Sequence, residues 1–86
     1  MTIATLEKIH ELLKAEVKTR NNELELTRKV YNERRDNLEA IAAAADDMSV
    51  AAAKWAVGTA QAAYDEARQQ SYDVAAALRD FEEQEF

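Results

Sequence analysis

The feature that most constrains this chain is a seven-residue repeat that runs through its second half, from Ser49 to Phe86. With Val50 at position a, ten of the eleven a and d sites are apolar or small: Val50, Ala53, Val57, Ala60, Tyr64, Ala67, Ser71, Val74, Leu78, Phe81 and, as the exception, Glu85. Such a repeat keeps one face of a helix against a partner helix. The second half is therefore predicted to be one helix of a coiled coil.

The first half carries a matching seam and is predicted to be the partner helix. Its positions are Ile3, Leu6, His10, Leu13, Val17, Arg20, Leu24, Thr27, Tyr31, Arg34, Leu38, Ile41 and Ala45. The repeat passes through Asn21-Asn22 without a change of phase. We therefore expect one unbroken helix, and a break at this asparagine pair is the alternative, because asparagine competes for backbone hydrogen bonds.

The predicted fold class is all-α, an antiparallel two-helix coiled-coil hairpin that forms a single domain of residues 1–86. The chain has no proline and one glycine, whereas sheets with tight turns need both glycine and proline in number. We expect the first helix over about residues 2–45, a turn over 46–49, and the second helix over about 49–84.

The turn is predicted from its capping residues, because the alanines before it would continue a helix. Asp46, Asp47 and Ser49 are all favourable N-cap residues, and a carboxylate there also meets the positive end of the next helix. In the register that we favour, facing residue numbers add up to 91, which places Leu38 beside Ala53. A register with a sum of 98 is the competitor.

Apolar positions away from the seam predict a contact with another helix. They include Ile9, Leu12, Leu26 and Val30 in the first helix and Ala51, Trp55, Gly58 and Ala62 in the second. Eighteen of the 86 residues are alanine, so one hairpin buries little apolar surface. We expect two hairpins to pair through these residues into a four-helix bundle. The alternative is that Trp55 folds over Ala51, Gly58 and Thr59 and lies half-buried within one hairpin.

The net charge of −6 comes entirely from the second half, because residues 41–86 hold nine acidic and three basic side chains. Such a surface repels phosphate, so we do not expect nucleic-acid binding. The basic segment 27–35 is expected to pair with neighbouring carboxylates. Cysteine is absent, and neither an 18-residue apolar stretch nor the apolar core of a signal peptide is found, so we predict a cytoplasmic protein that does not bind membranes.

No pattern of residues predicts catalysis, a cofactor or a metal. His10 is the single histidine and lies on the seam, where a packed residue is expected. Asp46-Asp47 does not form a calcium loop. We therefore predict a non-enzymatic interaction or assembly module that binds itself and another protein, of a kind common among accessory and structural proteins of bacteria and phages. The alternative is an acidic decoy or inhibitor that occupies a basic site on a nucleic-acid-handling protein.

A weaker alternative is an exported hairpin, because the chain resembles the small secreted WxG helical hairpins in size and class. That family carries Trp-x-Gly in the turn between its helices and a tyrosine motif near its C-terminus. Here Trp55-Ala56-Val57-Gly58 is one residue longer and falls inside the second helix. Tyr64 and Tyr72 have no acidic residue four positions further on. Membership of the family is therefore not assigned.

Overall fold

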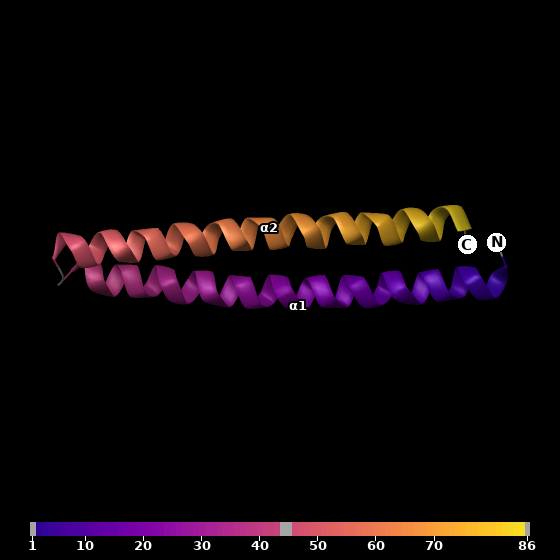
Figure 1. Ribbon diagram of the computed structural model, residues 1–86, viewed down its shortest axis with the longest axis horizontal. Helices are drawn as coiled ribbons and strands as arrows, with labels where there is room; N and C mark the ends of the chain where they lie inside the picture. Colours follow the sequence, from indigo (N-terminus) through magenta and orange to yellow (C-terminus); the bar gives the residue numbers. More distant parts are fainter. Residues whose placement is uncertain (1, 44–45, 86) are drawn as a thin grey trace.

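The computed structural model describes residues 2–43 and 46–85, which form two long helices that lie antiparallel (Figure 1). Helix α1 spans Ile3–Ala42 and helix α2 spans Asp47–Glu85. Together they make a rod of 64 × 14 × 14 Å, with both termini at the end opposite the turn. The predicted all-α helical hairpin is confirmed.

Side chains at the helix starts explain where each helix begins. Thr2 has an extended backbone, and its hydroxyl oxygen accepts the Thr5 backbone N–H at 3.2 Å. A carboxylate oxygen of Asp46 accepts the Ser49 N–H at 2.7 Å. Among the three candidate caps before the second helix, Asp46 therefore takes the capping place.

The helix bounds differ slightly from those expected. Because Asp46 is the cap, α2 starts at Asp47 and not at about Ser49. Helix α1 ends at Ala42, whereas the expected end, Ala45, lies with Ala44 outside the described residues. Helix α1 runs through Asn21-Asn22 without a break, as expected.

The two helices contribute differently to the core. The most buried residues are all small and all belong to α2: Ala53, Ala60, Ala67 and Ser71. The large seam residues of α1, such as Leu13, Leu24 and Tyr31, are half-buried. Large side chains of α1 thus lie over small residues of α2, so the small residues are covered completely while the large ones keep an outer edge in water.

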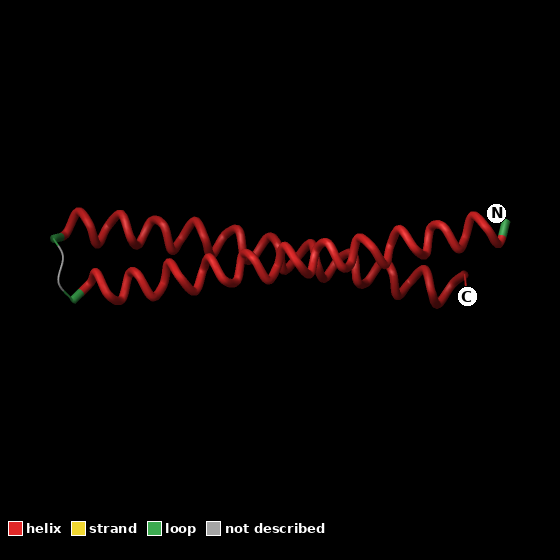
Figure 2. The backbone as a smooth tube through the Cα atoms, turned by 90° about the horizontal axis from the view of Figure 1, so that it is seen from below, coloured by secondary structure: helices red, strands yellow, loops and turns green. Residues whose placement is uncertain are grey.

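Contacts across the hairpin fix the register. His10 stacks on Phe81, Arg20 bonds to Gln70, and Ser71 donates to Asn21. The residue numbers of these pairs add up to between 90 and 92, so the favoured register is the observed one. A sum of 98 would instead place Arg20 beside Leu78, eight residues from its observed partner. Seen from below, the two helices cross near the middle of the rod (Figure 2).

Three predicted seam positions lie at the surface of the hairpin. Ile3 and Glu85 are exposed at the open end of the rod, where α1 extends beyond the end of α2 (Figure 1). Arg34 is exposed in the interior of α1, because its long side chain carries the charged group out to solvent.

Candidate interaction surface

An open groove follows one flank of the hairpin between α1 and α2. Its central part is a hollow of about 250 Å³ whose accessible lining is apolar, formed by Leu26, Thr27, Val30, Ala60 and Ala63. We call this hollow and its continuations the apolar groove. On the α2 side the groove is lined by alanines, whose side chains are short. The groove is therefore deep enough there to accept side chains from another molecule.

The groove continues towards the turn beneath the single tryptophan. This part has a volume of about 580 Å³ and shares Val30, Ala60 and Ala63 with the centre. Its other lining residues are Arg34, Ala52, Trp55, Ala56 and Thr59. Trp55 is 74% exposed, so the alternative in which it lies half-buried over its own helix is wrong.

In the other direction the groove stays largely apolar but gains charged and amide side chains at its rim. Glu23, Glu66 and Gln70 line this third part, together with Leu26, Thr27, Ala63 and Ala67. Arg34 thus lies at one end of the groove, and Glu23 and Glu66 lie at the other. Because the two ends carry opposite charge, the groove has a direction along the rod.

Of the charged residues at the two ends of the groove, some form ion pairs within the hairpin and others do not. Glu23 pairs with Arg20 at 3.0 Å, and Arg20 also pairs with Glu16 at 2.8 Å. These two carboxylates raise the pKa of Arg20 through hydrogen bonds and charge. Glu66 accepts only an amide hydrogen bond, from Gln70, among the interactions of the described residues. The ion pairs of the described residues do not include Arg34.

The groove brings together three of the eight residues that the sequence singles out. Leu26, Val30 and Trp55 line it, and Leu26 remains 62% exposed. Leu12 is also 62% exposed but lies nearer the open end, with Ile9, which is half-buried. The other three, Ala51, Gly58 and Ala62, are exposed on α2. A methyl group at Gly58 would contact nothing within 4 Å, so this glycine marks open surface.

Part of the α2 lining of the groove was missed by sequence reasoning. The missed residues are Ala52, Ala56, Thr59 and Ala63, which lie between the seam and Trp55 around the helix. Their spacing of three or four residues is the signal that could have found them. Choosing this side of α2 also required knowing that it faces the same flank as Leu26 and Val30, which only the hairpin geometry supplies.

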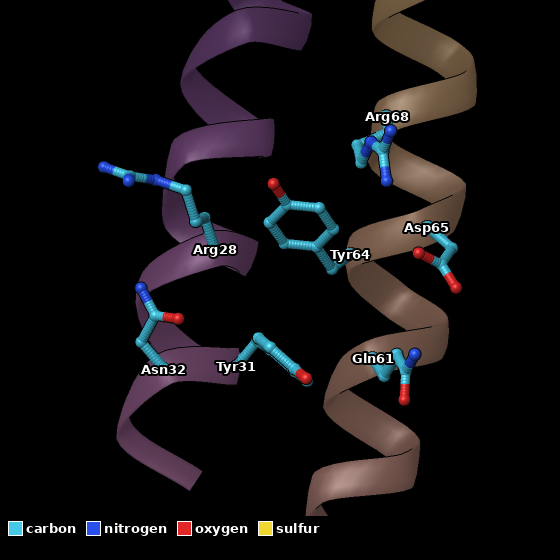
Figure 3. Close-up of a pocket in the computed structure, with 7 residues that line it drawn as sticks. All are labelled: Arg28, Tyr31, Asn32, Gln61, Tyr64, Asp65 and Arg68. Atoms are coloured by element: carbon cyan, nitrogen blue, oxygen red, sulfur yellow. The ribbon is translucent and has the colours of Figure 1, made fainter. Parts of the chain in front are cut away.

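The opposite flank of the hairpin is polar. A hollow of about 340 Å³ there is lined by Arg28, Tyr31, Asn32, Gln61, Tyr64, Asp65 and Arg68 (Figure 3). The Tyr31 and Tyr64 rings lie 6.0 Å apart between the helices, and Arg68 lies 5.7 Å from the Tyr64 ring centre. Figure 3 shows the Arg28 side chain pointing away from the gap between the helices.

The basic segment of α1 is paired mainly within its own helix. Arg28 bonds to Glu25, which lowers the pKa of the Glu25 carboxyl and raises that of Arg28. Arg35 lies 3.7 Å from Asp36. Arg20, which lies outside this segment, donates to the side-chain oxygen of Gln70 on α2 at 3.1 Å. Two basic residues of this segment, Arg28 and Arg35, thus pair with carboxylates of their own helix, as is common on a solvated helix face.

His10 belongs to a closing layer at the open end of the hairpin. Its ring stacks on Phe81 with 6.1 Å between centroids, and its Nε2 lies 2.9 Å from Glu82. This arrangement joins the first turns of α1 to the last turns of α2 and is the packed role expected for a seam histidine.

Within residues 2–43 and 46–85, no three His, Asp or Glu side chains are grouped so that they could hold a metal ion. Over the same residues, neither helix is apolar enough along its length to cross a membrane. The chain matches no protein-family model, no curated protein and no solved structure.

Proposed function

We propose that this protein is a non-enzymatic interaction module, a helical hairpin that associates with a second copy through the apolar groove to form a four-helix bundle. The observation that carries the proposal is the groove with its exposed apolar rim. Trp55 and Leu26 lie on the same flank, and each of these large residues is more than half exposed. Contiguous exposed apolar residues of this kind are typical of protein contact sites.

The composition of the core supports the same proposal. The buried residues of the described chain are three alanines and a serine, each 6–7% exposed, and none of its large side chains is fully buried. A helix pair with such a thin core gains most from further apolar burial. A partner helix fits the groove well because Ala60 and Ala63 allow its side chains to approach the α2 backbone.

The test is the concentration dependence of the molecular mass, measured by sedimentation, together with the fluorescence of Trp55. We expect a monomer–dimer equilibrium and a blue shift of the emission as dimers form. Trp55→Ala should raise the dissociation constant about tenfold or more, or about 1.4 kcal/mol, because a large aromatic side chain buried in a contact often contributes much of its energy.

Tyr72→Ala is the matched control. Tyr72 is 71% exposed, nearly as much as Trp55, but lies on the polar flank beside Asp65, Arg68 and Gln69. It should leave the association unchanged. A protein that stays monomeric at every concentration overturns the proposal. If such a monomer bound a basic protein in a strongly salt-dependent way, the decoy alternative would be favoured.

A further inference from the structure

We infer that the two copies pair antiparallel, groove to groove, with their turns at opposite ends of the bundle and with α1 facing α1 of the second copy. This inference rests on the proposed function and specifies how the partner is oriented. It follows from the placement of charge and of apolar residues along the groove.

The charged ends of the groove favour this orientation. Arg34 and Glu23 lie eleven residues apart on α1, or about 16 Å at 1.5 Å per residue. A two-fold axis across the rod, midway between them at about residues 28–29, places Arg34 of each copy at the end where the other copy carries Glu23 and Glu66. Two symmetric pairs of opposite charge then flank the contact.

The apolar residues agree with the same axis. Leu26 and Val30 lie on either side of the midpoint, so Leu26 of one copy meets Val30 of the other. On α2 the corresponding level is that of Ala63, given the register of the hairpin. Small residues at the two-fold axis let the two α2 helices approach closely. Trp55 then lies at the level of Gln70 of the other copy, over the part of its groove that Leu26, Ala67 and Gln70 line.

The parallel arrangement is disfavoured by like charges. With both turns at the same end, α1 of one copy faces α2 of the other at equal height along the rod. Glu23 then lies within about 3 Å, measured along the rod, of the level of Glu66 of the second copy. Two such carboxylate pairs at the rim of an apolar contact repel each other.

The size of the contact is consistent with a weak dimer. The axis lies nearer the turn than the open end, so the copies overlap for about 40 Å, twice the distance from the axis to the end of α1. With a width of 14 Å, each copy covers on the order of 600 Å², somewhat less than the roughly 800 Å² of a standard interface. Leu12 lies outside the overlap.

The orientation is tested by a distance between copies. The chain has no cysteine, so Met48→Cys, at an exposed position beside the turn, accepts a single spin label. In the antiparallel dimer the two labelled backbones lie about 43 Å apart along the rod. In a parallel dimer they lie at the same height, roughly 10–20 Å apart across the bundle. A dimer with only the short distance overturns the inference and leaves the proposed function standing, whereas the absence of a dimer overturns both.

Charge exchange provides an independent test. Arg34→Glu and Glu66→Arg should each weaken the dimer about tenfold, and the double variant should recover most of the loss. Arg35→Glu is the matched control, because Arg35 is the next residue of α1 and does not line the groove. Leu26→Ala should weaken the dimer and Leu12→Ala should not, although both leucines are 62% exposed. Equal effects of Arg34→Glu and Arg35→Glu, or of Leu26→Ala and Leu12→Ala, would contradict the antiparallel contact.

Discussion

A buried polar layer in the middle of the hairpin allows a sharp test of the packing. Ser71 is 7% exposed, and its hydroxyl donates to the side-chain oxygen of Asn21 across the two helices. Asn21→Ala leaves this hydroxyl without its partner, which costs about 1–3 kcal/mol when the group is fully buried. Because Asn21 itself is exposed, water and the carbonyl of the preceding turn can replace part of the bond, so we expect a loss of about 1–2 kcal/mol.

Helix propensity acts in the opposite direction and must be separated from the hydrogen bond. Replacing asparagine by alanine in a helix gains up to about 0.7 kcal/mol. Asn22→Ala carries this gain at an exposed neighbouring site and is the matched control. The free energy of unfolding of Asn21→Ala should therefore lie about 1–2 kcal/mol below that of Asn22→Ala.

The assay is urea unfolding followed by circular dichroism at one low protein concentration, because self-association adds to the apparent stability. Ser71→Ala removes the hydroxyl itself, so no buried donor is left without an acceptor, and the free energy of unfolding should change by less than about 0.5 kcal/mol. The double variant should recover the loss seen in Asn21→Ala. If Asn21→Ala and Asn22→Ala unfold alike, or if Ser71→Ala costs as much as Asn21→Ala, the hydroxyl is not held as the structure shows.

Three further outcomes are expected. Ala60→Leu should lower the free energy of unfolding by about 1–3 kcal/mol through overpacking, whereas Ala62→Leu, at an exposed position, should stay within about 0.5 kcal/mol. Asp46→Ala should lower the melting temperature by removing the cap of α2, and Asp46→Asn, which keeps a capping oxygen, should restore most of it. The Ser49 backbone N–H and hydroxyl lower the pKa of Asp46 below its ordinary 3.8, so the stability that this carboxylate contributes is complete above about pH 4 and is lost as the pH falls further. Asp46→Asn has no carboxylate at this position, so its melting temperature should fall less steeply below pH 4 than that of the parent protein. An equally steep fall would show that the Asp46 carboxylate is not the source of the acid sensitivity.

The heptad repeat was sufficient to predict the hairpin, and it favoured the observed register without excluding the other one. In the observed register Leu24 lies over Ala67, whereas a sum of 98 would place it beside Val74 and would still place Tyr31 over an alanine. The bounds of the turn were less predictable, because Asp46, Asp47 and Ser49 are all favourable caps. The choice of Asp46 depends on where the chain must reverse for the two seams to meet.

The groove was only partly predictable because exposure in a hairpin depends on both helices. The sequence identifies Leu26, Val30 and Trp55 as apolar residues away from the seam, and all three line the groove. Gly58 and Ala62 were grouped with Trp55 from spacing on one helix alone. A helix considered alone has two flanks beside its seam, and the flank that continues into α1 can be chosen only after the helices are paired.

The alanine content of α2 links the fold to the proposed contact. Alanine at Ala53, Ala60 and Ala67 brings the helices together over a narrow core, so that residues on the flanks of both helices remain uncovered. Whether a flank then attracts a partner depends on its own side chains. From Trp55 to Leu26 this flank is apolar, and at Glu23 and Glu66 it becomes charged. In the dimer that we propose, these carboxylates face Arg34 of the second copy, and this pairing of charges would give the association its direction.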